Sequence, residues 1–386
     1  MGARFSMPVV TTMVLLAAGC DGIGLPDLPT GPTTGGHPGG SGGTSETTGG
    51  GGTSGGGSTD SQVSPVLVAI AATPASASGV PGLADEIEAD ITTFGAGARA
   101  AVVSVPWSAA LPLDPSLAKR LDFYAAHDHR VLVNLAVVDR LADQRPAEIA
   151  STSWSGADAQ DAVHAALDAL LDAGGASVRF VTLGRDVDVY LAAHPNERAS
   201  FVAFAKEAAA YARSHAGAAS DLAVGVAFSP DAPKSEPAFT DLADASDVLG
   251  FSYFPGLGTY ESDATSGVVA AITALADAAM KKPIVLQAVG APSDPLAGGA
   301  DATQQAFFST LFGAVGARRE SFALVSVTEL HDAPASACAA WVASQGEAPD
   351  GPLAAYACSL GVLTTDGTPK PAWSAVIAGA AALSTP

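Results

Sequence analysis

The chain has 386 residues, of which 48% are hydrophobic and 15% are charged. This supplies enough apolar material for a large core, and α/β barrels of more than about 200 residues commonly form a single domain. The 18 Lys and Arg residues stand against 39 Asp and Glu residues, giving a formal net charge of −21. A chain this acidic repels phosphate backbones, so the composition argues against nucleic acid as a partner.

Residues 1–19 have the pattern of a signal peptide. Arg4 precedes an apolar run from Met7 to Ala18 that is too short to span a bilayer. The run leads into the sequence LLAAGC at residues 15–20, which resembles a bacterial lipobox, although Ala17 stands where that motif usually carries Leu. The resemblance implies lipid attachment to Cys20; the alternative is an ordinary secretory signal followed by a chance cysteine. We therefore expect an exported lipoprotein on a bacterial membrane, at its periplasmic face or at the cell surface.

Residues 20–63 have the composition of a flexible tether. From Gly31 to Asp60, 25 of 30 residues are Gly, Ser or Thr. Such a segment offers no apolar side chains to a core, so it is expected to be disordered. We interpret it as a linker that holds a folded domain away from the membrane.

Residues 64–386 repeat one pattern: a short apolar run, a polar loop and an Ala-rich helical stretch. The predicted strands are Val66–Ala72, Ala101–Val105, Val131–Val138, Arg179–Leu183, Ala223–Phe228, Val248–Tyr253, Pro283–Val289 and Phe322–Val327. The predicted helices are Leu83–Phe94, Ser116–His127, Asp158–Ala173, Glu197–His215, Glu236–Ala243, Ser266–Met280, Ala302–Gly316 and Pro371–Ala382.

This alternation predicts an α/β fold, a (β/α)8 TIM barrel. Continuous apolar runs are typical of strands buried on both faces, as in a parallel sheet. Eight strand–helix units favour a closed barrel over an open doubly wound sheet, and no glycine-rich nucleotide-binding turn follows the first strand. We expect a monomer without a cofactor.

In such a barrel the functional residues lie at the carboxyl ends of the strands. The polar and aromatic residues at these positions are Asp139, Asp186, Asp188, Tyr253, Asp294 and Glu329. His127 and His129 precede a strand instead, which places them at the opposite end, so no metal site is expected there. Aromatic residues on the active-end loops suit the CH faces of sugars, although we expect core packing for at least half of them. They are Trp107, Trp154, Tyr253, Phe254 and Tyr260.

Five segments carry a resemblance to a known group. They are VPWS at residues 105–108, LGRDVD at 183–188, DVLGFSYFP at 247–255, KPIVLQAVGAPS at 282–293, and the closing stretch at 360–373, which ends in KPAW. Together they resemble the clan A glycoside hydrolases, especially the bacterial endo-glycanase-like members, over most of residues 66–376. In that family the fourth strand carries Gly-Asn-Glu and the seventh carries Glu-x-Gly-x-Pro-Ser.

The resemblance also shows what is missing. In the family the strand-four Glu is the general acid/base and the strand-seven Glu is the nucleophile, about 5–5.5 Å apart in retaining enzymes. Here these positions hold Asp186 and Ala288, and Arg185 replaces the preceding Asn. A cation beside Asp186 is expected to lower the pKa of that carboxyl, whereas a general acid needs the opposite shift. The resemblance therefore implies that double-displacement hydrolysis is lost.

Glu329 ends the eighth strand, where the family usually carries an aromatic residue. With Asp186 it could form the wider carboxylate pair of an inverting hydrolase, about 6.5–9.5 Å apart, and Asp188 or Asp294 could substitute in a similar way. The interpretation that we favour is an ion pair between Glu329 and a neighbouring cation such as Arg185.

The sequence thus predicts a tethered, glycoside-hydrolase-like barrel that binds a poly- or oligosaccharide. The alternatives are an active hydrolase using Asp186 with Glu329, and a scaffold lipoprotein without a ligand. The expected sugar-binding residues are Trp107, Asp139, Arg185, Asp188, Tyr253 and Phe254. Cys338 and Cys358 are expected to form a disulfide, because the protein is predicted to be exported.

Overall fold

The computed structural model describes residues 65–75, 81–217, 220–260, 265–344 and 347–385. The predicted signal peptide, Cys20 and the predicted linker lie outside these residues. Within the described residues, no helix combines the length and the apolar character of a membrane span.

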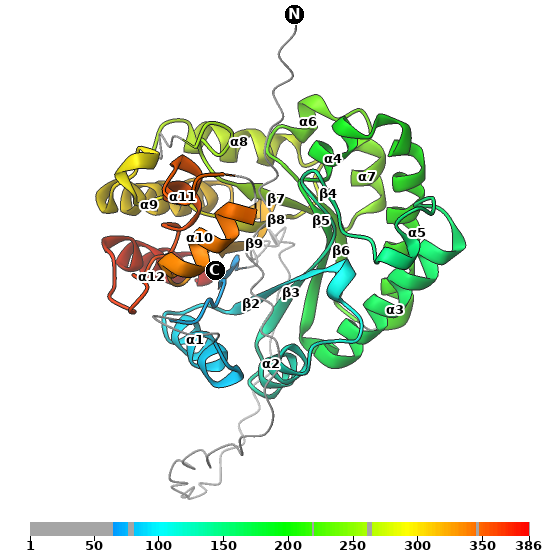
Figure 1. The fold of residues 1–386 in the computed structure, drawn as a ribbon, viewed down its shortest axis with the longest axis horizontal. Helices are drawn as coiled ribbons and strands as arrows, with labels where there is room; N and C mark the ends of the chain where they lie inside the picture. The colour runs from blue at the N-terminus through cyan, green and yellow to red at the C-terminus, as the bar shows by residue number, and fades with distance from the viewer. Residues whose placement is uncertain (1–64, 76–80, 218–219, 261–264, 345–346, 386) are drawn as a thin grey trace, which may run out of the picture. The chain divides into compact units, whose positions relative to one another are not determined.

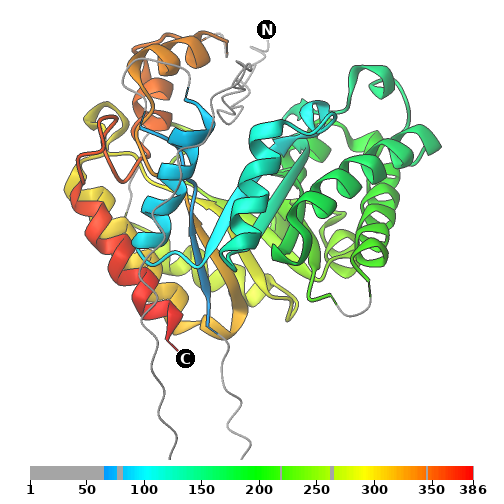
Figure 2. The ribbon, with the colours of Figure 1, turned by 90° about the horizontal axis from the view of Figure 1, so that it is seen from below.

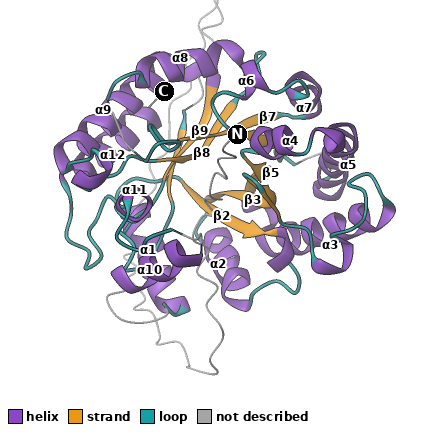
Figure 3. Cartoon of the chain, turned by 45° about the horizontal axis from the view of Figure 1, so that its top comes forward, coloured by secondary structure: helices purple, strands orange, loops and turns teal. Residues whose placement is uncertain are grey.

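Eight parallel strands close into a barrel, as the sequence predicts (Figures 1 and 3). They are β1 (Leu67–Ile70), β2 (Ala100–Pro106), β3 (Arg130–Asp139), β5 (Val178–Arg185), β6 (Ala223–Phe228), β7 (Val248–Tyr253), β8 (Ile284–Val289) and β9 (Phe322–Val327). The barrel closes because β1 pairs with both β2 and β9. A short strand, β4 (Ala142–Asp143), pairs antiparallel with the end of β3.

An outer ring of helices covers the barrel (Figure 1). These helices are α1 (Leu83–Gly95), α2 (Pro115–Ala126), α3 (Ala157–Gly174), α5 (Arg198–Ala216), α7 (Phe239–Ala245), α8 (Val268–Ala278), α9 (Asp301–Ala317) and α12 (Pro371–Ser384). Helix α7 begins three residues later than predicted. The reason is Glu236, whose Oε1 accepts hydrogen bonds from Arg198 Nε at 2.8 Å and Ala238 N at 2.9 Å, so that it ends α6 (Ala232–Ser235) instead of starting α7.

The interior of the barrel changes from apolar to polar towards the carboxyl ends of the strands. The apolar layer is formed by Ala69, Ala100, Leu132, Phe180, Val248, Val285 and Leu324. Further along the strands, Asn134 Nδ2 donates to Thr182 Oγ1 at 3.0 Å and to Gln287 Oε1 at 3.2 Å. Gly250 leaves room for this layer, since a Cβ there would lie 3.1 Å from Thr182 Cγ2. Polar groups that bond one another in this way can be buried without a large penalty.

Two further helices follow β9, namely α10 (Ala335–Ser344) and α11 (Pro352–Ala357). Cys338 and Cys358 join them in the predicted disulfide, with their Cα atoms 5.9 Å apart. A small apolar cluster, which includes Val342 and Leu353, surrounds the disulfide separately from the main core. Figure 2 shows this pair of helices in orange, at the end of the barrel away from the C-terminus of α12.

Candidate functional site

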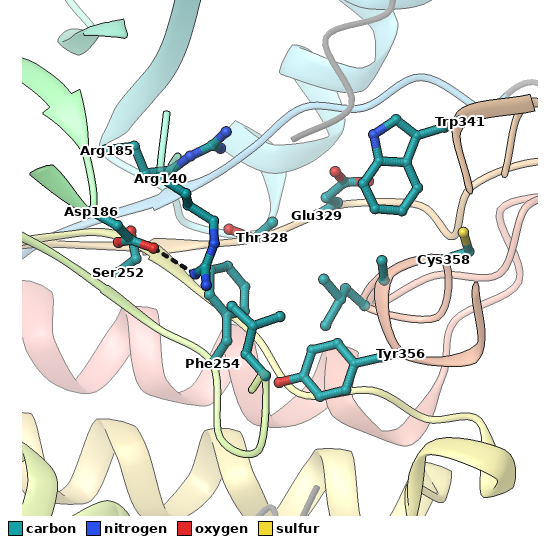
Figure 4. A pocket seen from close by; sticks show the side chains of 13 residues that line it. Arg140, Arg185, Asp186, Ser252, Phe254, Thr328, Glu329, Trp341, Tyr356 and Cys358 are labelled. Carbon is teal, nitrogen blue, oxygen red and sulfur yellow. Dashed lines mark hydrogen bonds and ion pairs between the residues drawn. The ribbon is translucent and has the colours of Figure 1, made fainter. Parts of the chain in front are cut away.

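A pocket opens at the carboxyl ends of the strands, where a barrel enzyme has its active site. Its empty volume is about 660 Å³, a figure that includes space open to solvent. The lining residues are Arg140, Arg185, Asp186, Ser252, Phe254, Leu257, Thr328, Glu329, Trp341, Tyr356, Ala357, Cys358 and Leu360. They come from the ends of β3, β5, β7 and β9 and from the α10–α11 segment (Figure 4).

The pocket lining combines polar and aromatic side chains. Asp186 and Ser252 lie next to each other, whereas Trp341 and Tyr356 lie across the pocket from them (Figure 4). Carboxyl groups and aromatic rings in one pocket can contact a ligand that has both polar and apolar faces.

Two crossed ion pairs connect the ends of β3 and β5. Arg185 donates from Nε to Asp139 Oδ1 at 2.8 Å and from its Nη2 to Asp139 Oδ2. Arg140 Nη1 donates to Asp186 Oδ2 at 2.9 Å, and Arg140 N donates to the Arg185 carbonyl oxygen, also at 2.9 Å. Each strand thus supplies one Asp and one Arg in opposite order, and the charges are matched locally.

The backbone at this junction is unusual. Asp186 has a φ of +49° and Arg140 has a φ of +54°, so both adopt the left-handed region, which costs a non-glycine residue about 1–2 kcal/mol. Gly184 has a φ of +74°, and a Cβ there would lie 2.5 Å from Val187 Cγ2. Such conformations concentrate at functional sites, and here they turn the Asp186 side chain into the pocket before α4 (Val187–Ala193) begins.

Burial raises the pKa of Asp186 to about 6, against the opposing effect of Arg140. Its Oδ1 atom is buried without a hydrogen-bond partner in the described part of the chain. Arg185 does lower this pKa, as expected, but burial outweighs it, so the net shift is upward and not downward. The guanidinium of Arg185 bonds to Asp139 through two nitrogens, and its remaining effect on Asp186 is smaller than that of desolvation.

Glu329 follows β9 and lines the same pocket as Asp186. Burial raises the pKa of Glu329 to about 7, and the nearby Asp332 adds to this, although Lys370 Nζ lies only 2.6 Å from the Asp332 carboxylate. The ion pair expected between Glu329 and Arg185 does not form, because the Arg185 guanidinium pairs with the Asp139 carboxylate instead. Among the described residues, no hydrogen bond to the Glu329 carboxyl group is seen, so it is available to a ligand.

The raised pKa of Glu329 predicts a specific dependence of stability on pH. The folded state retains this proton up to about pH 7, whereas the unfolded chain releases it near 4.5. Stability that depends on this proton is therefore present below about pH 4.5 and is lost as the pH rises to 7. We expect Glu329→Gln, which cannot ionise, to be more stable than the wild type at pH 8 by about 1–3 kcal/mol and equally stable at pH 4. Urea unfolding at both pH values measures this; exposed Glu320→Gln should show no pH-dependent difference.

The structure places four of the six expected sugar-binding residues away from the pocket. Trp107 is only 1% exposed and packs against Trp154 and Phe204, with ring centroids 6.1 and 5.5 Å away. Tyr253 is buried and lies 6.1 Å from Phe307, again between ring centroids. Side chains covered by the core in this way have no surface to offer a sugar.

The other two displaced residues are acidic. Asp139 is buried and holds Arg185, whereas Asp188 is buried and accepts hydrogen bonds from Ser229 N at 2.7 Å and Ser229 Oγ at 2.6 Å. Asp294 is also occupied, since it accepts from Leu296 N at 2.8 Å at the start of a short helical turn. All three therefore have structural partners, and of the expected set only Arg185 and Phe254 line the pocket.

Sequence reasoning missed Arg140, Ser252, Trp341 and Tyr356, all of which line the pocket. Arg140 directly follows Asp139 at a strand end, so the rule that selected Asp139 could have found it. Trp341 and Tyr356 lie between the two cysteines, in a segment that shows no barrel repeat, and nothing in the sequence directs them towards the pocket.

Ala288, which the sequence resemblance places at the nucleophile position, lies on β8 opposite Ser252 of β7. The preceding Gln287 is buried and bonded to Asn134 and Thr182 beneath the pocket. The methyl group of Ala288 offers no nucleophile, and the functional groups around the pocket come from the neighbouring strands.

At the opposite end of the barrel, His129 stacks on Phe94 with ring centroids 3.4 Å apart. Across the described residues, no group of three or more His, Cys, Asp or Glu side chains could hold a metal ion.

No protein-family model and no curated protein sequence matches the chain. Solved structures do match it. GH5_18 from Bifidobacterium longum subsp. longum has a TM-score of 0.63 at 19% identity, covering 82% of this chain and 79% of that one. GH5_18 from Streptomyces cattleya, in complex with GlcNAc, has a TM-score of 0.61 at 19% identity, covering 84% and 81%. An exo-β-1,4-mannosidase from an Opitutaceae bacterium has a TM-score of 0.57 at 16% identity, covering 83% and 60%. The fold is thus that of glycoside hydrolases with a TIM barrel.

Proposed function

We propose that this chain binds a carbohydrate in the pocket at the mouth of its barrel and has lost double-displacement hydrolysis. The observation that carries the proposal is the pocket lining, in which the carboxyl groups of Asp186 and Glu329 share one cavity with the aromatic rings of Trp341 and Tyr356. Carboxyl groups accept hydrogen bonds from sugar hydroxyl groups, and aromatic rings pack on the CH faces of a sugar. Ala288 supports the loss of the covalent step.

A binding screen tests this proposal. The purified domain is applied to an oligosaccharide array that includes Manβ1-4GlcNAc, which a Bifidobacterium neighbour binds in its solved structure, and reducing-sugar release is measured in parallel. We expect binding, and we expect Asp186→Ala to weaken it about 10- to 100-fold, because a hydrogen bond to a charged group is worth about 1.5–3 kcal/mol. The control is Asp294→Ala, which changes a carboxylate on the same end of the barrel but outside the pocket. Absence of binding across the array would favour the scaffold interpretation.

The second candidate function is inverting hydrolysis by Glu329 and Asp186. The favouring observation is that the two carboxyl groups share one pocket and that burial raises the pKa of both, to about 7 for Glu329 and about 6 for Asp186. A raised pKa is what the general acid of an inverting hydrolase requires, and in this candidate Glu329 is the acid and Asp186 the base.

NMR observation of the first product anomer distinguishes this candidate. Inverted configuration, together with a loss of about 100- to 10,000-fold in kcat for Glu329→Gln, would establish it. Unchanged turnover in Glu329→Gln would reject the assignment.

We further propose that the chain is a membrane lipoprotein anchored through Cys20, on the grounds of the lipobox-like sequence and the linker that follows it. Replacement of Cys20 by Ser is expected to release the domain into the soluble fraction and to stop incorporation of labelled fatty acid, because stable anchoring requires acyl chains. Fractionation of cells that express both forms measures this. Membrane partition that is unchanged by the substitution contradicts the proposal.

A further inference from the structure

The aromatic side of the pocket comes from outside the barrel repeat. Trp341 belongs to α10 and Tyr356 to α11, and both line the pocket opposite Asp186 (Figure 4). Glu329 itself occupies the strand-end position at which the sequence resemblance expects an aromatic residue. The α10–α11 segment thus supplies the ring surface that the strand end lacks.

Helix α11 is fixed to the barrel. Tyr356 Oη donates to the Pro255 carbonyl oxygen at 2.7 Å, and Ala355 and Tyr356 pack with Ala297. Immediately after Cys358, Ser359 Oγ accepts hydrogen bonds from Ser293 N and Asp294 N, both at 3.1 Å. Tyr356 is therefore held in place by contacts that do not involve the disulfide.

Helix α10 is attached in a different way. Cys338 and Val342, on its buried face, belong to the small cluster completed by Leu353 and Ala354 of α11, with Trp341 and Tyr260 at its edge. The disulfide from Cys338 to Cys358 adds a covalent cross-link from α10 to the fixed end of α11. Small clusters outside the main core unfold locally at low cost, so the position of Trp341 depends on this link.

We propose that Trp341 is the stacking platform for a sugar ring and that the Cys338–Cys358 disulfide holds it over the pocket, so that ligand binding and reduction of the disulfide oppose each other. This inference rests on the proposed carbohydrate-binding function. The opposition is reciprocal, because a ligand that prefers the oxidised form shifts the reduction equilibrium by the same factor.

The sulfur atoms differ in access. Cys358 lines the pocket, whereas Cys338 is buried. A dithiol reductant therefore attacks Cys358 Sγ from the pocket with one thiolate and displaces the Cys338 thiolate. The second thiol of the reductant then closes on its own bound sulfur and releases the Cys358 thiolate, so that one disulfide is reduced and the dithiol is oxidised. A sugar in the pocket obstructs the first attack.

Binding of Manβ1-4GlcNAc to the full chain, measured by calorimetry, tests the platform. We expect Trp341→Ala to weaken binding about tenfold, since a lost aromatic contact is worth about 1.4 kcal/mol, and Trp341→Phe to retain most of it. The double variant Cys338→Ser/Cys358→Ser should lose as much as Trp341→Ala, and combining all three changes should add little, because they remove one interaction. Saturating disaccharide should slow reduction of the wild type by dithiothreitol, monitored by alkylation and mass spectrometry.

Hydrogen exchange tests the attachment of α10 without a ligand. On reduction, the amides of α10 should lose protection, while α11 and the barrel strands keep theirs, which also shows that the reduced protein remains folded. Retained protection in α10, or wild-type affinity in Trp341→Ala, would overturn the inference. If the wild type binds no glycan on the array, the proposed function fails, and the exchange experiment still decides whether the disulfide holds α10.

Discussion

Replacing Arg185 with asparagine, the residue that the sequence resemblance implies at this position, is expected to destabilise the barrel by about 3–5 kcal/mol. Arg185 and Asp139 are 9% and 4% exposed and share two hydrogen bonds. Removing the guanidinium leaves a carboxylate in a low-dielectric site without its counter-ion. Urea unfolding at pH 7, followed by circular dichroism, measures the loss.

A second substitution separates this explanation from a general packing defect. In Arg185→Met/Asp139→Leu both charges are gone, and most of the stability should return, because apolar residues can replace a buried ion pair at little cost. The matched control is Asp221→Asn, which removes the partner of Arg179 in an exposed pair 4.0 Å apart; its midpoint should not move. An unchanged midpoint in Arg185→Asn would show that the pair does not stabilise the barrel.

The fold could be predicted because a strand that is buried on both faces consists of a continuous run of apolar residues, which is visible in the sequence. The runs at 223–228, 248–253 and 322–327 match β6, β7 and β9 residue for residue, and each has a polar residue directly at one end or at both, namely Ser229, Asp247, Ser321 and Thr328. Helix α7 starts later than predicted because Glu236 ends α6. An ion pair with Arg198 holds Glu236 there, and this contact between distant residues cannot be predicted from the local sequence. The barrel can therefore be predicted from the alternation of strands and helices, whereas the exact ends of a helix depend on tertiary contacts.

The site was predictable only in part, for a physical reason. The strand-end rule located Asp186 and Glu329 at one mouth, the family resemblance added Arg185, and all three line the pocket. The rule does not choose partners: Arg185 adjoins Asp186 in sequence but bonds Asp139 across to β3, while Arg140 takes Asp186. Because the pKa of a carboxyl depends on burial and on the actual partner, reasoning from sequence neighbours alone gave the wrong direction for Asp186.

The second large effect concerns formation of a covalent glycosyl-enzyme. We expect the wild-type domain to show no labelling by a mechanism-based 2-deoxy-2-fluoro glycosyl fluoride, because a glycosyl-enzyme requires a nucleophile and Ala288 has only a methyl group. Intact-protein mass spectrometry after prolonged incubation measures this, with an active retaining glycosidase as the positive control. Stoichiometric mass gain in the wild type would contradict the loss of double displacement.

Restoring the carboxylate supplies the complementary result. Ala288 is partly exposed and pairs with Ser252, whose side chain lines the pocket, so a longer side chain at this position can extend towards the ligand. We expect slow labelling in Ala288→Glu/Asp186→Glu, where Arg185 is left in place to keep Asp139 neutralised. Adding Arg185→Asn should reduce the yield of folded protein unless Asp139 is changed as well. If Ala288→Glu/Asp186→Glu folds and binds sugar but is never labelled, then position 288 does not face the anomeric carbon, and the family register at β8 does not apply to this chain.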